Sequence, residues 1–270
     1  MKVVFDVGGS HMRVGVSADG GELVQVTDVV TPVNPEEGML TLVDMAKRMV
    51  GEEKITAVAG GVAGVWNAEK SKILGSPNLT SWVDFPIKEK LQAMWGVEVR
   101  LENDAALGAL GEAVYGAGKN KQIVAYLAVG TGVGGARIVN GKIDENNLGF
   151  EPGHQYIGES TLEELVGGRS LEKKYGKRAE DITDAAVWEE VARHLAVGVV
   201  NTILLWSPHI VVMGGSVIRS IPWEKMIEEV SSRLKVYPWV PMLVRRSLGE
   251  KAGLYGGLAL LGQDQGGSRG

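Results

Sequence analysis

The chain contains the same glycine-tipped hairpin pattern twice, about half its length apart. Each copy is an apolar strand-like run, a tip of three small residues and a second apolar run; the tips are Gly8-Gly9-Ser10 and Gly130-Thr131-Gly132. Such a tip leaves backbone N–H groups uncovered, which suits a phosphate, although an ordinary tight hairpin has a similar composition. The repetition, with Asp6 before one tip and Thr131 within the other, favours two nucleotide-binding halves over two unrelated turns.

Each hairpin opens a similar series of segments, in which strands come first and helices alternate with strands afterwards. In the first half, periodicity and turn residues predict strands over 2–6, 12–17, 23–29, 55–59 and 97–101, with helices over 36–50, 87–95 and 105–115. In the second half, a strand meander begins near 121 and is followed by short helices over 161–175, helices over 183–206, 223–235 and 251–261, and strands over 210–213 and 242–246. We expect the strand over 55–59 to end at Gly60-Gly61, and residues 66–84 to form an irregular surface segment. The repeated order predicts a duplicated α/β domain.

The domain boundaries follow from this repeat. We expect a first lobe over 1–115, completed by a closing helix over 251–262, and a second lobe over 116–250. Residues 263–270 have the composition of a flexible tail. Ligands of such folds usually bind in a crevice, which we expect between the halves.

Composition excludes several classes of protein. The net charge of −5 argues against a nucleic-acid or anionic-membrane binder. The chain has no cysteine, so it can form neither disulfides nor thiolate metal sites. An apolar strand begins within two residues of the N-terminus, which leaves no room for a signal peptide, and we expect a cytoplasmic protein.

Polar residues follow one predicted strand where it meets a helix. Asn103 and Asp104 come directly after Glu102 and before the helix over 105–115. Asp104 has the position of an N-cap, but Asn103 can serve as the cap instead. The carboxyl ends of strands in α/β enzymes commonly carry reactive groups, so Asp104 is also a candidate catalytic residue.

Other candidates lie in loops. Asn78 is either a plain turn residue or a ligand-binding amide. Glu151 and His154, together with Glu163, form a cluster of acceptors and donors suited to sugar hydroxyls, although a lone histidine is more often structural. Gly214-Gly215 follows a buried strand, as glycines do in many sheets.

Taken together, these segments resemble the ROK group of sugar kinases, repressors and open reading frames within the actin-like ATPase superfamily. Residues 6–13 and 127–135 are similar to its two phosphate motifs, 76–79 with Trp82 and Pro86 to its sugar-contacting segment, 102–106 to its catalytic segment, 211–215 to its adenosine-side motif and 248–256 to its closing helix. The resemblance implies duplicated actin-like ATPase (ribonuclease H-like) domains that flank a cleft.

The resemblance also implies roles for residues. Asp104 would be the catalytic base, and Asp6 would hold Mg²⁺ through water. The residues expected to bind the nucleotide are Asp6, Gly8, Gly9, Ser10, Gly130, Thr131, Gly132, Gly214 and Gly215. The residues expected to bind the sugar are Asn78, Asn103, Asp104, Glu151, His154 and Glu163. The implied reaction is ATP-dependent phosphorylation of a hexose, with glucose converted to glucose 6-phosphate, and we expect a homodimer.

The chain departs from the family in one loop. The family usually has a cysteine-rich zinc loop after its Glu-x-Gly-His segment, whereas here only eight residues separate His154 from Glu163 and none is cysteine, so we expect no zinc. The start of the chain in a strand, where the family's repressors carry a helix-turn-helix, favours an enzyme.

Alternative functions remain open from the sequence. One is a polyphosphate-dependent glucokinase, for which a groove could be lined by the basic residues Lys119, Lys121, Lys173, Lys174, Lys177 and Arg178. The interspersed Glu172 and Glu180 favour a solvated surface instead. Others are a kinase for N-acylhexosamine, fructose or mannose, and a sugar-sensing protein without catalytic activity.

Overall fold

The computed structural model describes residues 1–263, which form two compact units. The first unit comprises residues 1–115, 145–149 and 250–263, and the second comprises 116–144 and 150–249. Residues 264–270 of the expected tail lie outside the described residues. Each unit contains a five-stranded mixed sheet with helices, which confirms the predicted duplicated α/β fold.

The sheet of the first unit has a meander on one side and parallel strands on the other. Its strands are β1 (Lys2–Val7), β2 (His11–Ser17), β3 (Gln25–Val30), β4 (Ala57–Val62) and β7 (Val99–Glu102). They lie in the order β3-β2-β1-β4-β7, in which β1 is antiparallel to β2 and parallel to β4, and β4 is parallel to β7.

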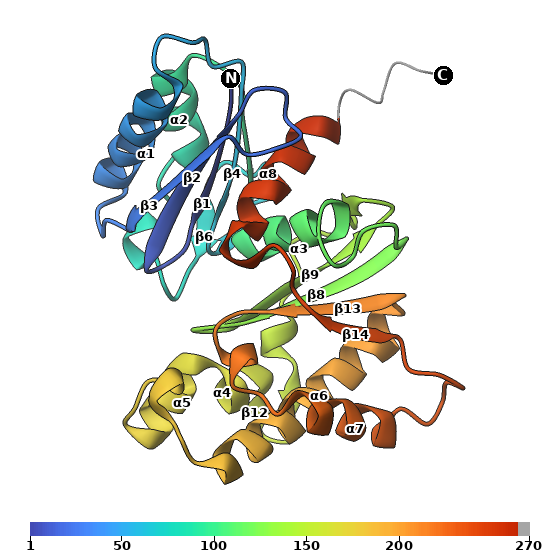
Figure 1. Ribbon diagram of the computed structural model, residues 1–270. Helices are drawn as coiled ribbons and strands as arrows, with labels where there is room; N and C mark the ends of the chain where they lie inside the picture. The colour runs from blue at the N-terminus through green and yellow to red at the C-terminus, as the bar shows by residue number, and fades with distance from the viewer. Residues whose placement is uncertain (264–270) are drawn as a thin grey trace. The chain divides into compact units, whose positions relative to one another are not determined.

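Helices cover both faces of this sheet (Figure 1). They are α1 (Pro35–Val50), α2 (Ile87–Trp95), α3 (Asp104–Val114) and α8 (Ala252–Gly262), the last preceded by the 3-10 turn η5 (Gly249–Lys251). Because side chains alternate along a strand, Val3 and Phe5 of β1 join the core formed with α1 and α2, whereas Val4 packs against α8. Helix α1 begins at Asn34, whose side chain accepts hydrogen bonds from the N–H groups of Glu36 and Glu37.

Helices α3 and α8 pack against each other through small residues. A Cβ added at Gly256 would lie 1.9 Å from the carbonyl oxygen of Leu107, and one at Gly111 would lie 2.1 Å from that of Ala252. Backbone therefore approaches backbone at this interface, which explains the many alanines and glycines that the sequence places in both helices.

Two expectations for the first unit are wrong. Strand β4 runs to Val62 instead of ending before Gly60-Gly61, and Gly60 lies within it because the Phe5 ring occupies the space where a side chain would project. The segment 66–84 is not an irregular surface loop. It contains β5 (Val65–Trp66), β6 (Ile73–Gly75) and the 3-10 turn η1 (Thr80–Trp82), and its indole rings at Trp66 and Trp82 are buried.

The second unit repeats the strand order of the first. Its sheet consists of β8 (Ile123–Val129), β9 (Val133–Val139), β10 (Lys142–Ile143), β13 (Ile210–Gly214) and β14 (Met242–Arg245), in the order β10-β9-β8-β13-β14. One face is covered by helices α4 (Leu162–Val166), α5 (Gly168–Tyr175), α6 (Ala185–Trp206) and α7 (Trp223–Arg233) (Figure 1). Shorter elements are η2 (Pro152–His154), η3 (Ala179–Asp181), η4 (Val217–Arg219) and the hairpin of β11 (Tyr156–Ile157) and β12 (Ser160–Thr161). No helix within residues 1–263 is long and apolar enough to cross a membrane.

Candidate active site

In the first unit, the parallel strands end at one edge of the sheet. Val7 pairs with Val62, and Gly61 pairs with Glu102, so the loops that follow β1, β4 and β7 leave the sheet together. These loops carry Gly8, Gly64 and Asp104 respectively. The edge therefore combines the first glycine tip with the candidate catalytic carboxylate, as expected for a ligand site in an α/β fold.

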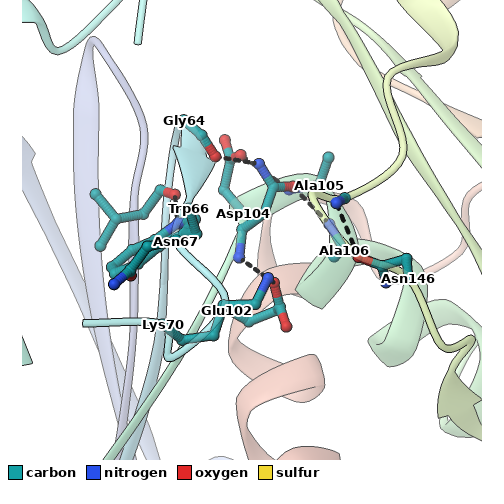
Figure 2. Close-up of polar contacts among 12 residues, drawn as sticks. Gly64, Trp66, Asn67, Lys70, Glu102, Asp104, Ala105, Ala106 and Asn146 are labelled. Carbon is teal, nitrogen blue, oxygen red and sulfur yellow. Dashed lines mark hydrogen bonds and ion pairs between the residues drawn. The ribbon is translucent and has the colours of Figure 1, made fainter. Parts of the chain in front are cut away.

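Asn103 fixes the corner at which Asp104 lies. Figure 2 shows Asp104 with its neighbours Glu102 and Ala105. Asn103 is the N-cap of α3: its Oδ1 accepts a hydrogen bond from the Ala106 N–H at 3.0 Å, and its Nδ2 donates to the carbonyl oxygen of Gly64 at 3.0 Å. Asp104 is the first helical residue, and its Oδ1 accepts a hydrogen bond from the Ala105 N–H at 2.9 Å. The amide of Asn103 keeps one N–H and one lone pair for a ligand. The corner thus presents a carboxylate at a helix N-terminus, where negative charge is favoured.

A lysine and a glutamate form an ion pair next to the same corner. Lys70 Nζ lies 2.5 Å from Glu102 Oε1, and this oxygen also accepts a hydrogen bond from the Asn103 N–H at 2.8 Å. The pair was not identified from the sequence, because the partners are 32 residues apart and Lys70 lies in a segment expected to be irregular.

The first glycine tip lies against Asn78. A Cβ added at Gly9 would be 2.6 Å from Cβ of Asn78, so the tip and the candidate sugar-binding turn touch. Thr31 holds the tip in place: its hydroxyl donates to the Gly8 carbonyl at 2.7 Å, and its N–H donates to the Ser10 carbonyl at 3.0 Å. Backbone carbonyls of the tip are therefore engaged in the fold.

The carboxylate of Asp6 faces the beginning of α8. A Cβ added at Gly253 would lie 2.6 Å from Asp6 Oδ2, so only glycine leaves room for this carboxylate. Nearby, Arg13 on β2 forms an ion pair with Glu250 at 3.4 Å. Asp6 is thus a single carboxylate held between β1 and a helix N-terminus.

In the second unit, the beginning of α5 holds the second glycine tip. The N–H groups of Gly168 and Arg169 donate to the carbonyls of Gly130 and Thr131 at 2.8 and 3.0 Å, and within the tip Gly130 N–H donates to Gly132 O at 2.9 Å. The side chain of Thr131 is exposed. Three backbone hydrogen bonds therefore fix a three-residue tip whose threonine is exposed.

Gly214 and Gly215 lie beside this tip. Gly215 has a φ of 97°, and a Cβ there would lie 2.1 Å from the Val129 carbonyl oxygen. The side chain of Arg246 passes over Gly214, with its Cδ 2.5 Å from where a Cβ would be. The edge of the second sheet thus combines the tip, the Gly214-Gly215 turn and an arginine that was not identified from the sequence, since Arg246 seemed only to end a strand.

Glu163 contacts the second tip, and Glu151 pairs with His154. Glu163 Oε2 accepts a hydrogen bond from the Val133 N–H at 2.7 Å, and Glu151 Oε2 lies 3.4 Å from His154 Nδ1. Burial raises the pKa of Glu151, and the charge of Glu163 raises it further, whereas His154 opposes the shift. The second unit therefore brings Glu151 and His154 into contact and places Glu163 at the glycine tip.

Two of the basic residues near 173–178, Lys174 and Arg178, are paired with acids. Lys174 lies 3.0 Å from Glu190, and Arg178 lies 2.8 Å from Glu180 and 3.1 Å from Asp181. These side chains are largely exposed. The arrangement agrees with the solvated surface that the interspersed acids predict.

The donor set does not fit a structural zinc. The chain has no cysteine, and among residues 1–263 no three His, Asp or Glu side chains form a group that could hold a metal ion. The β11–β12 hairpin lies between His154 and Glu163, where the family's zinc loop would be. A closed tetrahedral zinc site therefore has no ligands here.

A family model, a solved structure and curated proteins match this chain. The model of the ROK family matches residues 3–264. The structure of a ROK hexokinase from Thermus thermophilus superposes with a TM-score of 0.85 at 29% identity, covering 98% of this chain and 99% of that one. The glucokinase of Streptomyces coelicolor is 27% identical over 95% of this chain and 96% of its own length. The xylose repressor of Bacillus subtilis is 31% identical, but over 60% of this chain and 50% of its own length.

Proposed function

The chain belongs to the ROK family and is a sugar kinase, and from this premise we propose that it transfers the γ-phosphoryl group of ATP to glucose to give glucose 6-phosphate. The observation that carries the proposal is the Asn103–Asp104 corner. It presents one carboxylate at the sheet edge, beside the turn of Asn78 and the first glycine tip.

Asp104 would accept the proton of the attacking hydroxyl. Phosphoryl transfer requires little covalent chemistry of the protein and depends on positioning and charge stabilisation. A base placed within hydrogen-bonding reach of the hydroxyl contributes about 10²–10⁴ to the rate. Asn78 and the remaining N–H and lone pair of Asn103 would orient the sugar in the first unit.

The second unit offers groups suited to the donor. The tip of Gly130, Thr131 and Gly132 would bind phosphate oxygens, as would Gly8, Gly9 and Ser10 in the first unit. Gly214 and Gly215 would let an adenosine approach the backbone closely, and Arg246 adds a positive charge at that edge.

Other residues of the second unit are suited to the sugar. Glu151, His154 and Glu163 would supply acceptors and a donor for sugar hydroxyls.

Magnesium fits this arrangement as an ion that accompanies the nucleotide. Mg²⁺ typically keeps several waters and is held by one or two carboxylates plus substrate phosphates. Asp6 is such a single carboxylate and would contact the hydrated ion, which neutralises charge on the phosphate oxygens during transfer.

Two observations bear on the alternatives. The paired basic side chains of Lys174 and Arg178 offer little uncompensated charge to a polyphosphate, which favours ATP as the donor. A sensor without catalytic activity has no need of a carboxylate at the position of Asp104, which favours the kinase.

A coupled assay with MgATP and about a dozen sugars tests the proposal. We expect the highest kcat/KM with glucose, and faster turnover with ATP than with polyphosphate at equal phosphate concentration. A higher kcat/KM with fructose, mannose or an N-acylhexosamine would replace the acceptor. Faster turnover with polyphosphate would replace the donor, and sugar binding without turnover would favour the sensor.

A further inference from the structure

Lys70 has an unusual backbone conformation and a mostly buried charge, and the function proposed above does not use it. Its φ is 49°, in the left-handed region that residues with a Cβ rarely adopt. Its ammonium lies 2.5 Å from Glu102 Oε1, and the two side chains are only 28% and 14% exposed (Figure 2). A sparsely populated conformation that places a charge in a defined contact indicates a functional constraint.

The ion pair acts on the residue that precedes the candidate base. Glu102 Oε1, which receives the Lys70 ammonium, also accepts the hydrogen bond from the Asn103 N–H. The peptide that joins Asn103 to Asp104 follows at once. Lys70 is therefore connected to Asp104 through one carboxylate and one hydrogen-bonded backbone N–H.

The β5–β6 hairpin holds the corner at two separate points. Gly64, just before β5, accepts the hydrogen bond from the Asn103 amide, and Lys70, at the hairpin tip, contacts Glu102. Asn67 fixes the tip: its Oδ1 accepts hydrogen bonds from the N–H groups of Ser71 and Lys72 at 2.9 and 3.1 Å. The backbone on either side of Lys70 is thus held while its side chain reaches Glu102.

The same hairpin continues into the turn expected to bind the sugar. Strand β6 ends at Gly75, and Ser76, whose hydroxyl accepts a hydrogen bond from the Leu79 N–H at 3.1 Å, begins the turn that contains Asn78. The segment from Gly64 to Asn78 therefore contacts the Asn103–Asp104 corner near its beginning and contains Asn78 at its end.

We propose that Lys70 is a positioning residue of the kinase: through Glu102 it fixes the Asn103–Asp104 corner relative to the hairpin that leads to Asn78. This inference rests on the proposed function and adds to it a residue that would touch neither sugar nor nucleotide. The β5–β6 hairpin would set the distance between the bound hydroxyl and its base.

Loss of the ammonium would leave Glu102 as a mostly buried carboxylate without its cation, which is unfavourable unless the side chain turns towards water. Such a rotation releases the Asn103 N–H and lets the corner shift. A displacement of about 1 Å at a catalytic group can cost about 10²-fold in rate. The effect falls on the transferring step, so kcat decreases while KM for each substrate is maintained.

The decisive comparison is Lys70→Met against Lys72→Met on the same hairpin. Lys72 pairs with Asp84 at 2.7 Å, but both side chains are exposed, by 43% and 67%, so its loss removes a lysine without disturbing the corner. We expect Lys70→Met to lower kcat by about ten- to a hundredfold, with both KM values within about twofold. Lys72→Met keeps kcat within about twofold, and Lys70→Arg restores most of the lost kcat because it keeps the cation.

Two further variants separate positioning from folding. Lys70→Gly adopts a φ of 49° without strain, so it keeps the hairpin but still loses the ammonium, and we expect the same decrease in kcat. In a Glu102→Gln background, Lys70→Met should have little further effect, because the partner charge is already absent.

Three results would each overturn the inference. The first is turnover of Lys70→Met and Lys70→Gly within about twofold of an active wild type, and the second is a higher KM with unchanged kcat. The third is additivity of the effects of Lys70→Met and Glu102→Gln. A wild type that phosphorylates no sugar would overturn the proposed function and this inference together. Full turnover in the Lys70 variants would overturn the inference alone.

Discussion

The two units have the same sheet order and the same three-residue tips, but different charged side chains lie at the ends of their strands. In the first unit the edge has carboxylates at Asp6, Glu102 and Asp104. In the second, Ala128 occupies the position that corresponds to Asp6, one residue before the end of the first strand, and Arg246 directly follows the last strand. The same strand order therefore carries a carboxylate near the end of its first strand in one unit and an arginine after its last strand in the other.

The units also differ in how tightly their helices pack. In the first unit, α3 and α8 approach each other backbone to backbone at Gly111 and Gly256. In the second, a Cβ added at Gly198 of α6 would meet the side chain of Leu162. At these two helix contacts, an added methyl group would therefore meet backbone atoms in the first unit and a side chain in the second.

The largest expected effect tests the carboxylate edge. Asp104→Asn should lower kcat by about 10²–10⁴, because the amide cannot accept the proton. The affinity for sugar should stay nearly intact, because the amide has the size of the carboxylate. Steady-state kinetics and calorimetric titration with glucose measure the two quantities. Asp84→Asn, an exposed carboxylate of the same unit, is the control; turnover of Asp104→Asn within tenfold of the wild type would remove Asp104 from the mechanism.

The second prediction sharpens the difference in helix packing. Gly256→Ala should destabilise the fold by about 3 kcal/mol, because its Cβ would meet the backbone oxygen of Leu107. Gly198→Ala should cost less, about 1 kcal/mol, because its Cβ would meet the methyl groups of the Leu162 side chain instead of a backbone atom, and because alanine has a higher helix propensity than glycine. Chemical denaturation of both variants measures the difference, and equal losses would show that the two helix layers are packed alike.

The smallest expected effect concerns Glu151 in the second unit. Burial, and then the charge of Glu163, raise the pKa of Glu151 above its ordinary value of 4.5. An acid whose pKa is higher in the folded state costs stability as pH rises from 4.5 through the raised pKa, and the cost persists at neutral pH. Glu151→Gln lacks this cost, so its Tm relative to the wild type should be higher at pH 7 than at pH 4.

The change in Tm should be small, since the side chain of Glu151 is 42% exposed and solvent screens its interactions. Glu180→Gln, an exposed carboxylate paired with Arg178 in the same unit, serves as the control and should show no such increase. A Tm difference for Glu151→Gln that is the same at both pH values would contradict the raised pKa.

Sequence periodicity predicted most of the fold because the elements that surround the tips are strongly patterned. The helix over 87–95 matches α2, and the helix over 36–50 begins within one residue of α1, where Asn34 and Pro35 provide local start signals. The end of β4 was missed because the fit of Gly60 depends on Phe5 of a neighbouring strand. The burial of Trp66 and Trp82 was missed because β5 and the 3-10 turn η1, which contain them, are only two and three residues long. Elements this short have too few residues to show a hydrophobic periodicity.

In the candidate site, too, some residues could be identified from the local sequence and others could not. Asn103 could be recognised as a possible cap, and Asp104 as a candidate catalytic residue, from their place between a strand and a helix, whereas the role of base came from the family resemblance. The contact of Lys70 with Glu102 and the position of Arg246 over Gly214 depend on tertiary structure. Local sequence contains no signal for such pairs, since their partners lie 32 residues apart in both cases.

The different ligands proposed for Asn78 and Arg246 are tested most directly by binding measurements. Glucose and a non-hydrolysable ATP analogue are titrated into Asn78→Ala and into Arg246→Ala. The account predicts that Asn78→Ala weakens glucose binding by about tenfold or more and leaves nucleotide binding within about twofold, since a lost hydrogen bond to a ligand costs about 1.4 kcal/mol. Arg246→Ala should do the reverse. If either variant weakens both ligands equally, or if Arg246→Ala affects glucose alone, then Asn78 and Arg246 are not divided between the acceptor and the donor as the account requires.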